Sequence, residues 1–244
     1  MGYVLRMANH TLLDFPTATL SETFFWTAVP PDEDAAPALE ASESMLSEEE
    51  RARAHRFHFF ADRSAYITAH ALLRRALSEI YEEISPGAWN FENTPIGKPF
   101  LPLEAGFPRL HFSLTHSRRL VACLVSRDGV CGIDVEQIGR VSDPLFLSRS
   151  RFSEVETGDL AALSGRRRDA YFTELWCLKE AYLKAKGVGL TVPLSDVYFR
   201  FEPGEATPST FCPLAGDAAA DWCFRLMRPN DTHVLAAAVC LRGA

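Results

Sequence analysis

The stretch TELWCLKEAYLKAKGVGL, residues 173–190, decides the fold of the second part of the chain. Apolar side chains in it and just before it are separated by four, three, four and three residues: Tyr171, Leu175, Leu178, Tyr182 and Ala185. This spacing predicts an α-helix with one face in the core. Two glycines follow, Gly187 and Gly189, and residues that are free to adopt positive φ commonly end a helix.

The polar residues of this helix allow two interpretations. Lys179 and Glu180 lie roughly 100° apart around the helix, and Lys184 lies one turn beyond Glu180. Glu180 and Lys184 could be an ordinary surface ion pair, which stabilises a helix by only a few tenths of a kcal/mol. Alternatively, one acid and two amines could form part of a site. The helix alone favours the surface pair.

Composition limits the class of protein. The chain has 244 residues, 47% of them hydrophobic and 23% charged, which suits one large soluble domain or two domains of about 120 residues. The formal charge of −7 argues against a general nucleic-acid binder, because no global positive field attracts phosphates. An anionic ligand would therefore have to be held by a local cluster of basic groups.

We expect a cytoplasmic protein without a membrane segment. The N-terminal residues lack the apolar core of a secretory signal, and no run approaches the roughly eighteen apolar residues of a membrane span. The six cysteines show neither a CxxC pair nor metal-ligand spacing. Because most lie in apolar segments, we interpret them as buried reduced thiols, with disulfides or zinc as the less favoured alternatives.

The first half of the chain is expected to contain a helix and several strands. Residues 20–29 are rich in aromatic and β-branched residues and predict a strand, whereas residues 30–45 resemble an exposed connection. Ser47 and Glu50 have the spacing of a capping box that starts a helix. A helical apolar stripe continues that segment: Ala65, Ala69, Leu72, Leu73, Ala76, Leu77 and Ile80.

Strands are expected after the Pro- and Gly-rich residues 85–108, which predict a loop or a short edge strand. Residues 111–115 and 121–125 suggest a hairpin, and residues 130–136 another strand. The order partly repeats, with a mixed segment, the helix quoted above and further strands. We therefore predict an α+β fold rather than a βαβ repeat.

The strand at 130–136 carries two acids. Asp134 and Glu136 alternate with Cys131, Ile133 and Val135, so the acids lie on one face and the apolar side chains on the other. Carboxylates two residues apart on a strand are roughly 7 Å apart at the backbone and can converge on one cation. A solvent-facing strand end remains the simpler interpretation. If a metal binds, an oxygen-preferring ion such as Mg²⁺ or Mn²⁺ is expected.

Two further segments carry polar groups. Thr115, His116 and Ser117 follow an alternating strand and could bind an oxyanion, although a lone histidine at a strand end is more often structural. Lys98 lies in the stiff turn Gly97-Lys98-Pro99, where a solvated lysine is the default interpretation.

Together the four segments resemble a known family. GKP at 97–99, HFSLTHS at 111–117, GIDVE at 132–136 and WCLKEAYLKAKGVGL at 176–190 are similar to the ordered signature of 4'-phosphopantetheinyl transferases. The similarity is to the longer single-chain branch typified by the surfactin-synthetase activator and covers about residues 45–200. One departure is Thr115, where the family commonly has serine.

The resemblance implies two similar α+β halves that form a pseudo-dimer within one chain, with the halves at 1–129 and 130–244. Coenzyme A would bind at their interface, and the chain would be a monomer. The metal ligands that the resemblance implies are Asp134, Glu136 and Glu180. The implied coenzyme-binding residues are Arg53, Lys98, Thr115, His116, Lys179 and Lys184, with His116 near the 3'-phosphate and both Lys179 and Lys184 near the pyrophosphate.

The implied reaction transfers the phosphopantetheine arm of coenzyme A to a serine of an apo acyl- or peptidyl-carrier protein and releases 3',5'-ADP. Glu180, acting directly or through a metal-bound water, is our preferred general base and Glu136 the alternative, with Lys184 as a catalytic cation. A Mg²⁺-dependent pyrophosphate hydrolase and an inactive carrier-binding module remain alternatives.

The carrier protein would dock on a local basic patch or an apolar contact, because the chain itself is acidic. Two arginine groups are candidates, Arg166 to Arg168 and Arg118 with Arg119, although solvated loop arginines would give the same pattern. No nucleic acid or membrane partner is expected.

Overall fold

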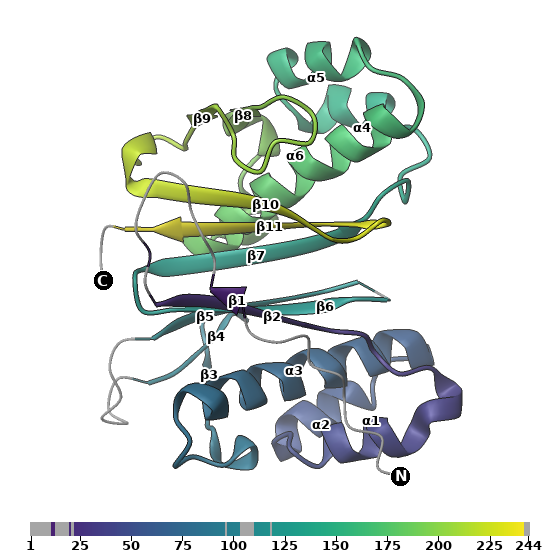
Figure 1. The fold of residues 1–244 in the computed structure, drawn as a ribbon, viewed down its shortest axis with the longest axis vertical. Helices are drawn as coiled ribbons and strands as arrows, with labels where there is room; N and C mark the ends of the chain where they lie inside the picture. Colours follow the sequence, from purple (N-terminus) through teal and green to yellow (C-terminus); the bar gives the residue numbers. More distant parts are fainter. Residues whose placement is uncertain are drawn as a thin grey trace.

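Two long helices, α3 (Phe60–Ile80) and α6 (Gly165–Lys186), each cover one face of an antiparallel sheet (Figure 1). The two sheets face each other, so the layers run helix, sheet, sheet, helix (Figure 1). The structure is a computed structural model that describes residues 11–12, 20, 22–95, 97–102, 110–117 and 119–241. The predicted α+β class is confirmed.

The first half is a four-stranded sheet covered by α3. Its strands, in spatial order, are β1 (Thr11–Leu12), β2 (Thr23–Ala28), β6 (Val121–Ser126) and β5 (His111–His116). The predicted hairpin is confirmed, because β5 and β6 pair antiparallel. The apolar stripe of α3 is buried against β6 through residues such as Leu72, Leu73 and Leu77, which form one core cluster with Val121 and Val125.

The second half is a three-stranded sheet covered by α6. Its strands, in spatial order, are β10 (Trp222–Asn230), β11 (His233–Cys240) and β7 (Val130–Gln137). Leu175, Leu178 and Tyr182 of α6 are fully buried in one cluster with Val234 and other residues of β11. The helix ends where the glycines predict, since Gly187 caps it with φ +67°.

A third apolar cluster fills the space between the sheets. Leu124 of β6 packs there with Ile133 and Val135 of β7. Side-chain hydroxyls of β5 join the two halves: the backbone N–H of Ile133 donates to Ser113 Oγ and that of Val135 donates to Thr115 Oγ1, each at 3.2 Å. Strand β5 therefore lies beside β7, and the end of α6 passes over the seam between the halves.

Two expectations about the first half are wrong. Residues 30–45 are not an open connection, because they contain the 3-10 turn Glu33–Ala35 and helix α1 (Ala36–Glu43), whose Leu39 packs on Ile67 of α3. The capping box of Ser47 and Glu50 is present and starts helix α2 (Glu48–Ala54). However, α2 ends at Ala54 and does not run on into α3. The apolar pattern of α1 is too short to reveal its helical period.

The remaining elements are short. The helices are α4 (Pro144–Arg151) and α5 (Glu154–Ala161), and the 3-10 turns are Pro86–Ala88, Gly189–Thr191, Leu194–Asp196 and Ala219–Asp221. Two small hairpins complete the chain: β3 (Glu92–Asn93) with β4 (Pro99–Phe100), and β8 (Tyr198–Arg200) with β9 (Thr210–Cys212).

The cysteines are free thiols, as predicted, but they are not all buried. Cys123, Cys131, Cys177 and Cys223 are buried, Cys240 is half-buried, and Cys212 is exposed on β9. Among the helices that the structure describes, none combines the length and the apolar character that a membrane span requires.

Candidate active site

The acids of β7 and of α6 come together at the seam between the halves. Strand alternation directs Asp134 and Glu136 to the face that α6 covers, while Cys131, Ile133 and Val135 pack between the sheets, as predicted. Asp134 is only 5% exposed, and Glu136 is half-buried. The negative charges of Asp134 and Glu136 both act on Glu180.

Lys184 neutralises part of this charge. Its Nζ lies 2.6 Å from Asp134 Oδ1 and also donates to Thr115 Oγ1 at 3.2 Å and to the carbonyl oxygen of Ile133 at 3.3 Å. Thr115 Oγ1 in turn donates to Asp134 Oδ1 at 3.1 Å. One amine and one hydroxyl therefore fix the orientation of Asp134, and they come from opposite halves of the chain.

Two carboxylates of this cluster, those of Glu136 and Glu180, hold protons more tightly than free acids do. Burial, followed by the charge of Asp134, raises the pKa of Glu180 to about 7, although Lys184 opposes this shift. Burial and then Asp134 also raise the pKa of Glu136, against the effect of its ion pair with Arg140 at 3.0 Å. For Lys184, burial acts to lower the pKa, but Asp134 and Glu180 outweigh it and raise the pKa. Lys184 and Arg140 therefore do not fully compensate the negative charge of the three acids.

The donor atoms fit a hard cation. Asp134 Oδ2 and Glu180 Oε1 are buried and have no hydrogen-bond partner within the part of the chain that the structure describes. Such oxygens are the ligands that Mg²⁺ prefers. Across those same residues, no three His, Cys, Asp or Glu side chains are close enough to enclose a metal on their own. A bound Mg²⁺ would therefore take its other ligands from water and from a phosphate, as it usually does.

A cleft of about 450 Å³ runs from this cluster into the first half. It is lined by both halves, and four of its lining residues were predicted as coenzyme-binding residues: Arg53, Lys98, His116 and Lys184. A net acidic chain thus gathers basic groups in one place. Partial enclosure, and then the charges of Lys184 and His70, lower the pKa of His116 and outweigh the opposing charges of Asp62 and Asp134.

Lys98 joins the two halves at the floor of the cleft. Its Nζ donates to the carbonyl oxygens of Lys184 at 2.7 Å and Ala185 at 3.4 Å. A cation at these last carbonyls complements the negative end of the α6 dipole. Burial lowers the pKa of Lys98. Lys98 therefore fixes the end of α6 that carries Lys184.

The structure corrects the assignment of Lys179, which does not reach the cleft. Its side chain is fully buried and forms an ion pair with the fully buried Glu156 at 2.8 Å. Nζ also donates to the carbonyl oxygens of Leu194, at 2.8 Å, and of Val197. With all its donors engaged, Lys179 ties α6 to α5 and to the turn before β8.

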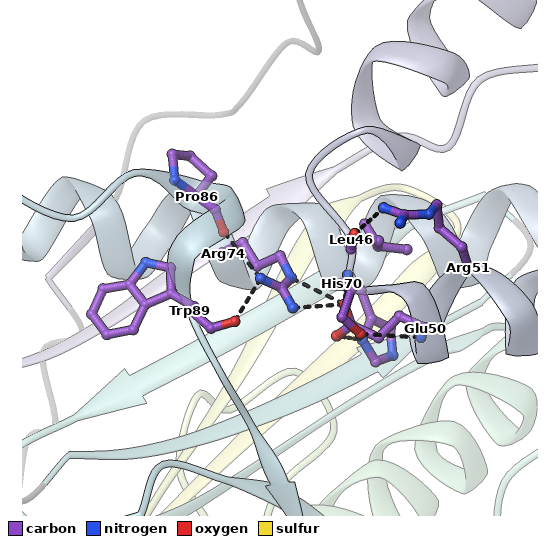
Figure 2. A network of polar contacts seen from close by, with 8 residues as sticks. Leu46, Glu50, Arg51, His70, Arg74, Pro86 and Trp89 are labelled. Carbon is purple, nitrogen blue, oxygen red and sulfur yellow. Dashed lines mark hydrogen bonds and ion pairs between the residues drawn. The ribbon is translucent and has the colours of Figure 1, made fainter. Parts of the chain in front are cut away.

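The sequence analysis missed a polar network on α2 and α3 (Figure 2). Glu50 lies between two residues of α3, with Oε1 2.9 Å from His70 Nδ1 and Oε2 2.7 Å from an Arg74 guanidinium nitrogen. Burial acts to raise the pKa of Glu50, but the hydrogen bond and charge of His70 and the charge of Arg74 outweigh it and lower the pKa to about 2. Tyr66, His70 and Arg74 recur every four residues on α3, and this polar line was a readable signal.

A second cavity, of about 260 Å³, opens beside Glu136. Phe172 and Trp176 of α6 and Val141 give it apolar walls, and Arg140 lies at its polar side. Because Lys184 lines the first cleft and Glu136 the second cavity, the acid cluster lies between the two.

The predicted arginine clusters remain untested as docking sites. Arg168 donates to the carbonyl oxygens of Leu160 and Leu163, and Arg166 to that of Asp231, so both support the start of α6. Arg118 lies outside the described residues, and Arg119 is exposed.

Comparisons with known proteins cover nearly the whole chain. Residues 130–239 match the sequence model of the 4'-phosphopantetheinyl transferase superfamily, and residues 33–127 match that of the 4'-phosphopantetheinyl transferase N-terminal domain. The 4'-phosphopantetheinyl transferase HetI of Nostoc sp. strain PCC 7120 is 31% identical over 96% of this chain and 95% of that protein. The transferase psf-1 of Bacillus pumilus is 34% identical over 72% and 73%, and Sfp of Bacillus subtilis strain 168 is 31% identical over 64% and 67%.

Proposed function

The chain belongs to the 4'-phosphopantetheinyl transferase superfamily, and from this premise we propose that its cleft binds coenzyme A for transfer of the phosphopantetheine arm. The acceptor is a serine hydroxyl of an apo acyl- or peptidyl-carrier protein, and 3',5'-ADP leaves. The observation that supports this most strongly is the meeting of Asp134, Glu136 and Glu180 with Lys184 at the end of a basic cleft.

The coenzyme fits along the two cavities. Its nucleotide end occupies the cleft near Arg53 and His116, and its diphosphate lies at Lys184, where the cleft meets the acids. The pantetheine arm extends into the apolar cavity between Phe172 and Trp176. Since Thr115, Lys98 and Arg53 come from residues 1–129 and the acids from residues 130–244, one chain supplies every group, which favours a monomer.

A divalent cation completes the charge balance. We assign Mg²⁺, with Mn²⁺ as a substitute, to Asp134, Glu136 and Glu180, because two of their oxygens are buried and have no hydrogen-bond partner among the described residues. When bound, such an ion would neutralise negative charge on the diphosphate and on its transition state. Lys184 supplies the protein's own positive charge at the same place.

We assign Glu180 as the general base that accepts the proton of the attacking serine. Without a cation, burial and the charge of Asp134 raise the pKa of Glu180 to about 7, and a bound cation would lower it. The assignment therefore rests on the place of Glu180 in the acid cluster, where it lies within reach of the charges of Asp134, Glu136 and Lys184. The serine oxygen forms a bond to the phosphorus that carries the pantetheine arm, the bond from that phosphorus to the bridging oxygen breaks, and 3',5'-ADP takes the electron pair. Glu136 is the alternative base, but its carboxylate is already engaged by Arg140 at 3.0 Å.

The test is the intact mass of an apo carrier protein after incubation with the enzyme, coenzyme A and Mg²⁺. We expect the carrier to gain one phosphopantetheine arm. Replacing Glu180 with Gln should slow this gain by about a hundredfold or more, since general-base groups contribute on that scale.

Glu174→Gln is the matched control, because Glu174 is also a buried carboxylate of α6 but pairs with Arg228, away from both cavities. It should retain transfer. Near-normal turnover by Glu180→Gln would exclude Glu180 as the base. Release of free phosphopantetheine without a carrier would instead indicate a pyrophosphate hydrolase.

A further inference from the structure

We propose that His70, held in place by Glu50, is an additional coenzyme-binding residue that selects coenzyme A through the monoester phosphate on its ribose. This inference rests on the proposed function and adds a specificity residue that the sequence motifs do not contain. The ligand chemistry is a phosphate monoester dianion, which distinguishes coenzyme A from its 3'-dephospho form.

The position of His70 supports a ligand contact. His70 is half-buried and lines both the coenzyme cleft and an adjoining cavity of about 450 Å³ over α2 and α3. Arg53 and Tyr66 line both cavities as well. His70 comes from α3 in the first half and Lys184 from α6 in the second, so we place an anion at His70 apart from the diphosphate at Lys184. Besides its diphosphate, coenzyme A carries one other anionic group, the phosphate monoester on its ribose.

The imidazole ring is fixed by its surroundings. Glu50 Oε1 engages Nδ1 at 2.9 Å, and within the described part of the chain no hydrogen bond engages Nε2, which leaves this nitrogen for a ligand. The ring of Tyr66 packs on the imidazole of His70 with 4.1 Å between their centroids. The guanidinium of Arg53 lies over the Tyr66 ring, 5.7 Å from its centroid. A ring held on two sides loses little freedom when a ligand binds.

Glu50 itself is held rigidly, and this is what makes it a support rather than a mobile partner (Figure 2). Its Oε2 accepts from Arg74 at 2.7 and 3.1 Å and from the backbone N–H of Ser47 at 2.8 Å. Arg74 is 1% exposed and also donates to the carbonyl oxygens of Pro86 and Trp89. The network therefore fixes α2, α3 and the following turn around His70.

The charges favour an anion on the side of the cleft, whose described lining contains Arg53, Lys98, His116 and Lys184 and no acid, whereas the adjoining cavity is lined by Glu48, Glu49 and Glu50. Glu50 is the carboxylate partner of His70, and the low pKa of Glu50 keeps that carboxylate ionised. The charge of His70 also reaches His116, so these two histidines and Arg53 surround one end of the cleft. A phosphate dianion would relieve the repulsion between the histidines.

The test compares coenzyme A with 3'-dephospho-coenzyme A as substrates of the parent and of His70→Gln. Loss of a charge-assisted hydrogen bond should raise KM for coenzyme A about tenfold or more, with kcat nearly unchanged. KM for the dephospho form should not change. A purely structural histidine would alter both coenzymes equally, and equal changes, or none, would overturn the proposal.

His55→Gln is the matched control, because His55 also pairs with a glutamate, Glu43 at 2.8 Å, but is exposed and lies outside the cleft. It should leave both KM values as they are. The ratio of the two KM values does not depend on the fraction of folded enzyme, and His70→Arg, which keeps a positive charge, should recover part of the preference. If folded His70→Arg recovers none of the preference for coenzyme A, a positive charge at this position is not what selects the phosphate.

Calorimetric titration separates this inference from the proposed function. Coenzyme A and its dephospho form can each be titrated into the parent and His70→Gln without a carrier protein. A preference for coenzyme A that disappears in His70→Gln supports the role of His70 even if no arm is transferred. Absence of a preference in the parent would contradict it.

Discussion

At the scale of single residues, two lysines of α6 show how surroundings decide a role. Lys184 is half-buried and faces Asp134 at the cleft, so its amine can meet a ligand. Lys179, five residues earlier, is buried in an ion pair with Glu156. It lines neither the coenzyme cleft nor the cavity beside Glu136. The same side chain therefore serves binding in one case and the packing of α5 on α6 in the other.

Replacing Lys179 with Met should destabilise the protein without altering the affinity of the folded fraction for coenzyme A. The change leaves Glu156 buried without its cation, which typically costs about 3–5 kcal/mol. Thermal melting should show a large decrease in melting temperature, and KM for coenzyme A should stay the same.

Lys184→Met provides the contrast, because it should impair coenzyme binding and transfer with a smaller loss in melting temperature. The double variant Lys179→Met with Glu156→Gln should melt higher than the single variant. An increased KM at unchanged stability would instead assign Lys179 to the coenzyme site.

At the scale of elements, the short distance between β7 and α6 determines whether the acids of the two elements lie close together. A Cβ atom built on Gly132 would lie 2.0 Å from the carbonyl oxygen of Ala181, so only glycine allows this approach. The contact occurs two residues before Asp134 and one residue after Glu180. Close packing here brings the strand acids and the helix acid into one cluster.

Gly132→Ala should push α6 away from β7 and reduce both stability and transfer. The clash is with backbone atoms of the helix, which cannot rotate aside, so overpacking should cost at least about 1–3 kcal/mol. Chemical denaturation and the carrier mass assay measure the two effects.

Gly158→Ala is the control for this substitution. A Cβ atom on Gly158 meets nothing within 4 Å, and the residue lies inside helix α5. Alanine there should stabilise by about 0.5–1 kcal/mol and leave transfer intact. Full activity of Gly132→Ala would show that the close approach is not needed.

At the scale of the whole molecule, local patterns predicted the elements and the acids. Alternation correctly assigned Asp134 and Glu136 to one face of β7, because one face of that strand is buried against the other sheet. The spacing of α6 and its terminal glycine predicted the helix and its end. These features depend on residues that are close in sequence.

Features that depend on distant residues were not predictable in the same way. Helix α6 is buried on more than one side, so its period could not show that Lys179 faces Glu156 rather than the cleft. The role of His70 depends on Glu50, twenty residues away on another helix. The four-residue spacing of Tyr66, His70 and Arg74 can be read in the sequence, but the contact between His70 and Glu50 is visible only once α2 is packed on α3.

The central claim is that both halves of the chain hold one coenzyme molecule across their seam. A crystal structure with bound coenzyme A and Mg²⁺ tests it most directly. The account predicts the diphosphate beside Lys184 and the acids Asp134, Glu136 and Glu180, with the ribose phosphate at His70 and His116. A coenzyme that contacts only one half, or whose diphosphate lies away from Lys184, would contradict it.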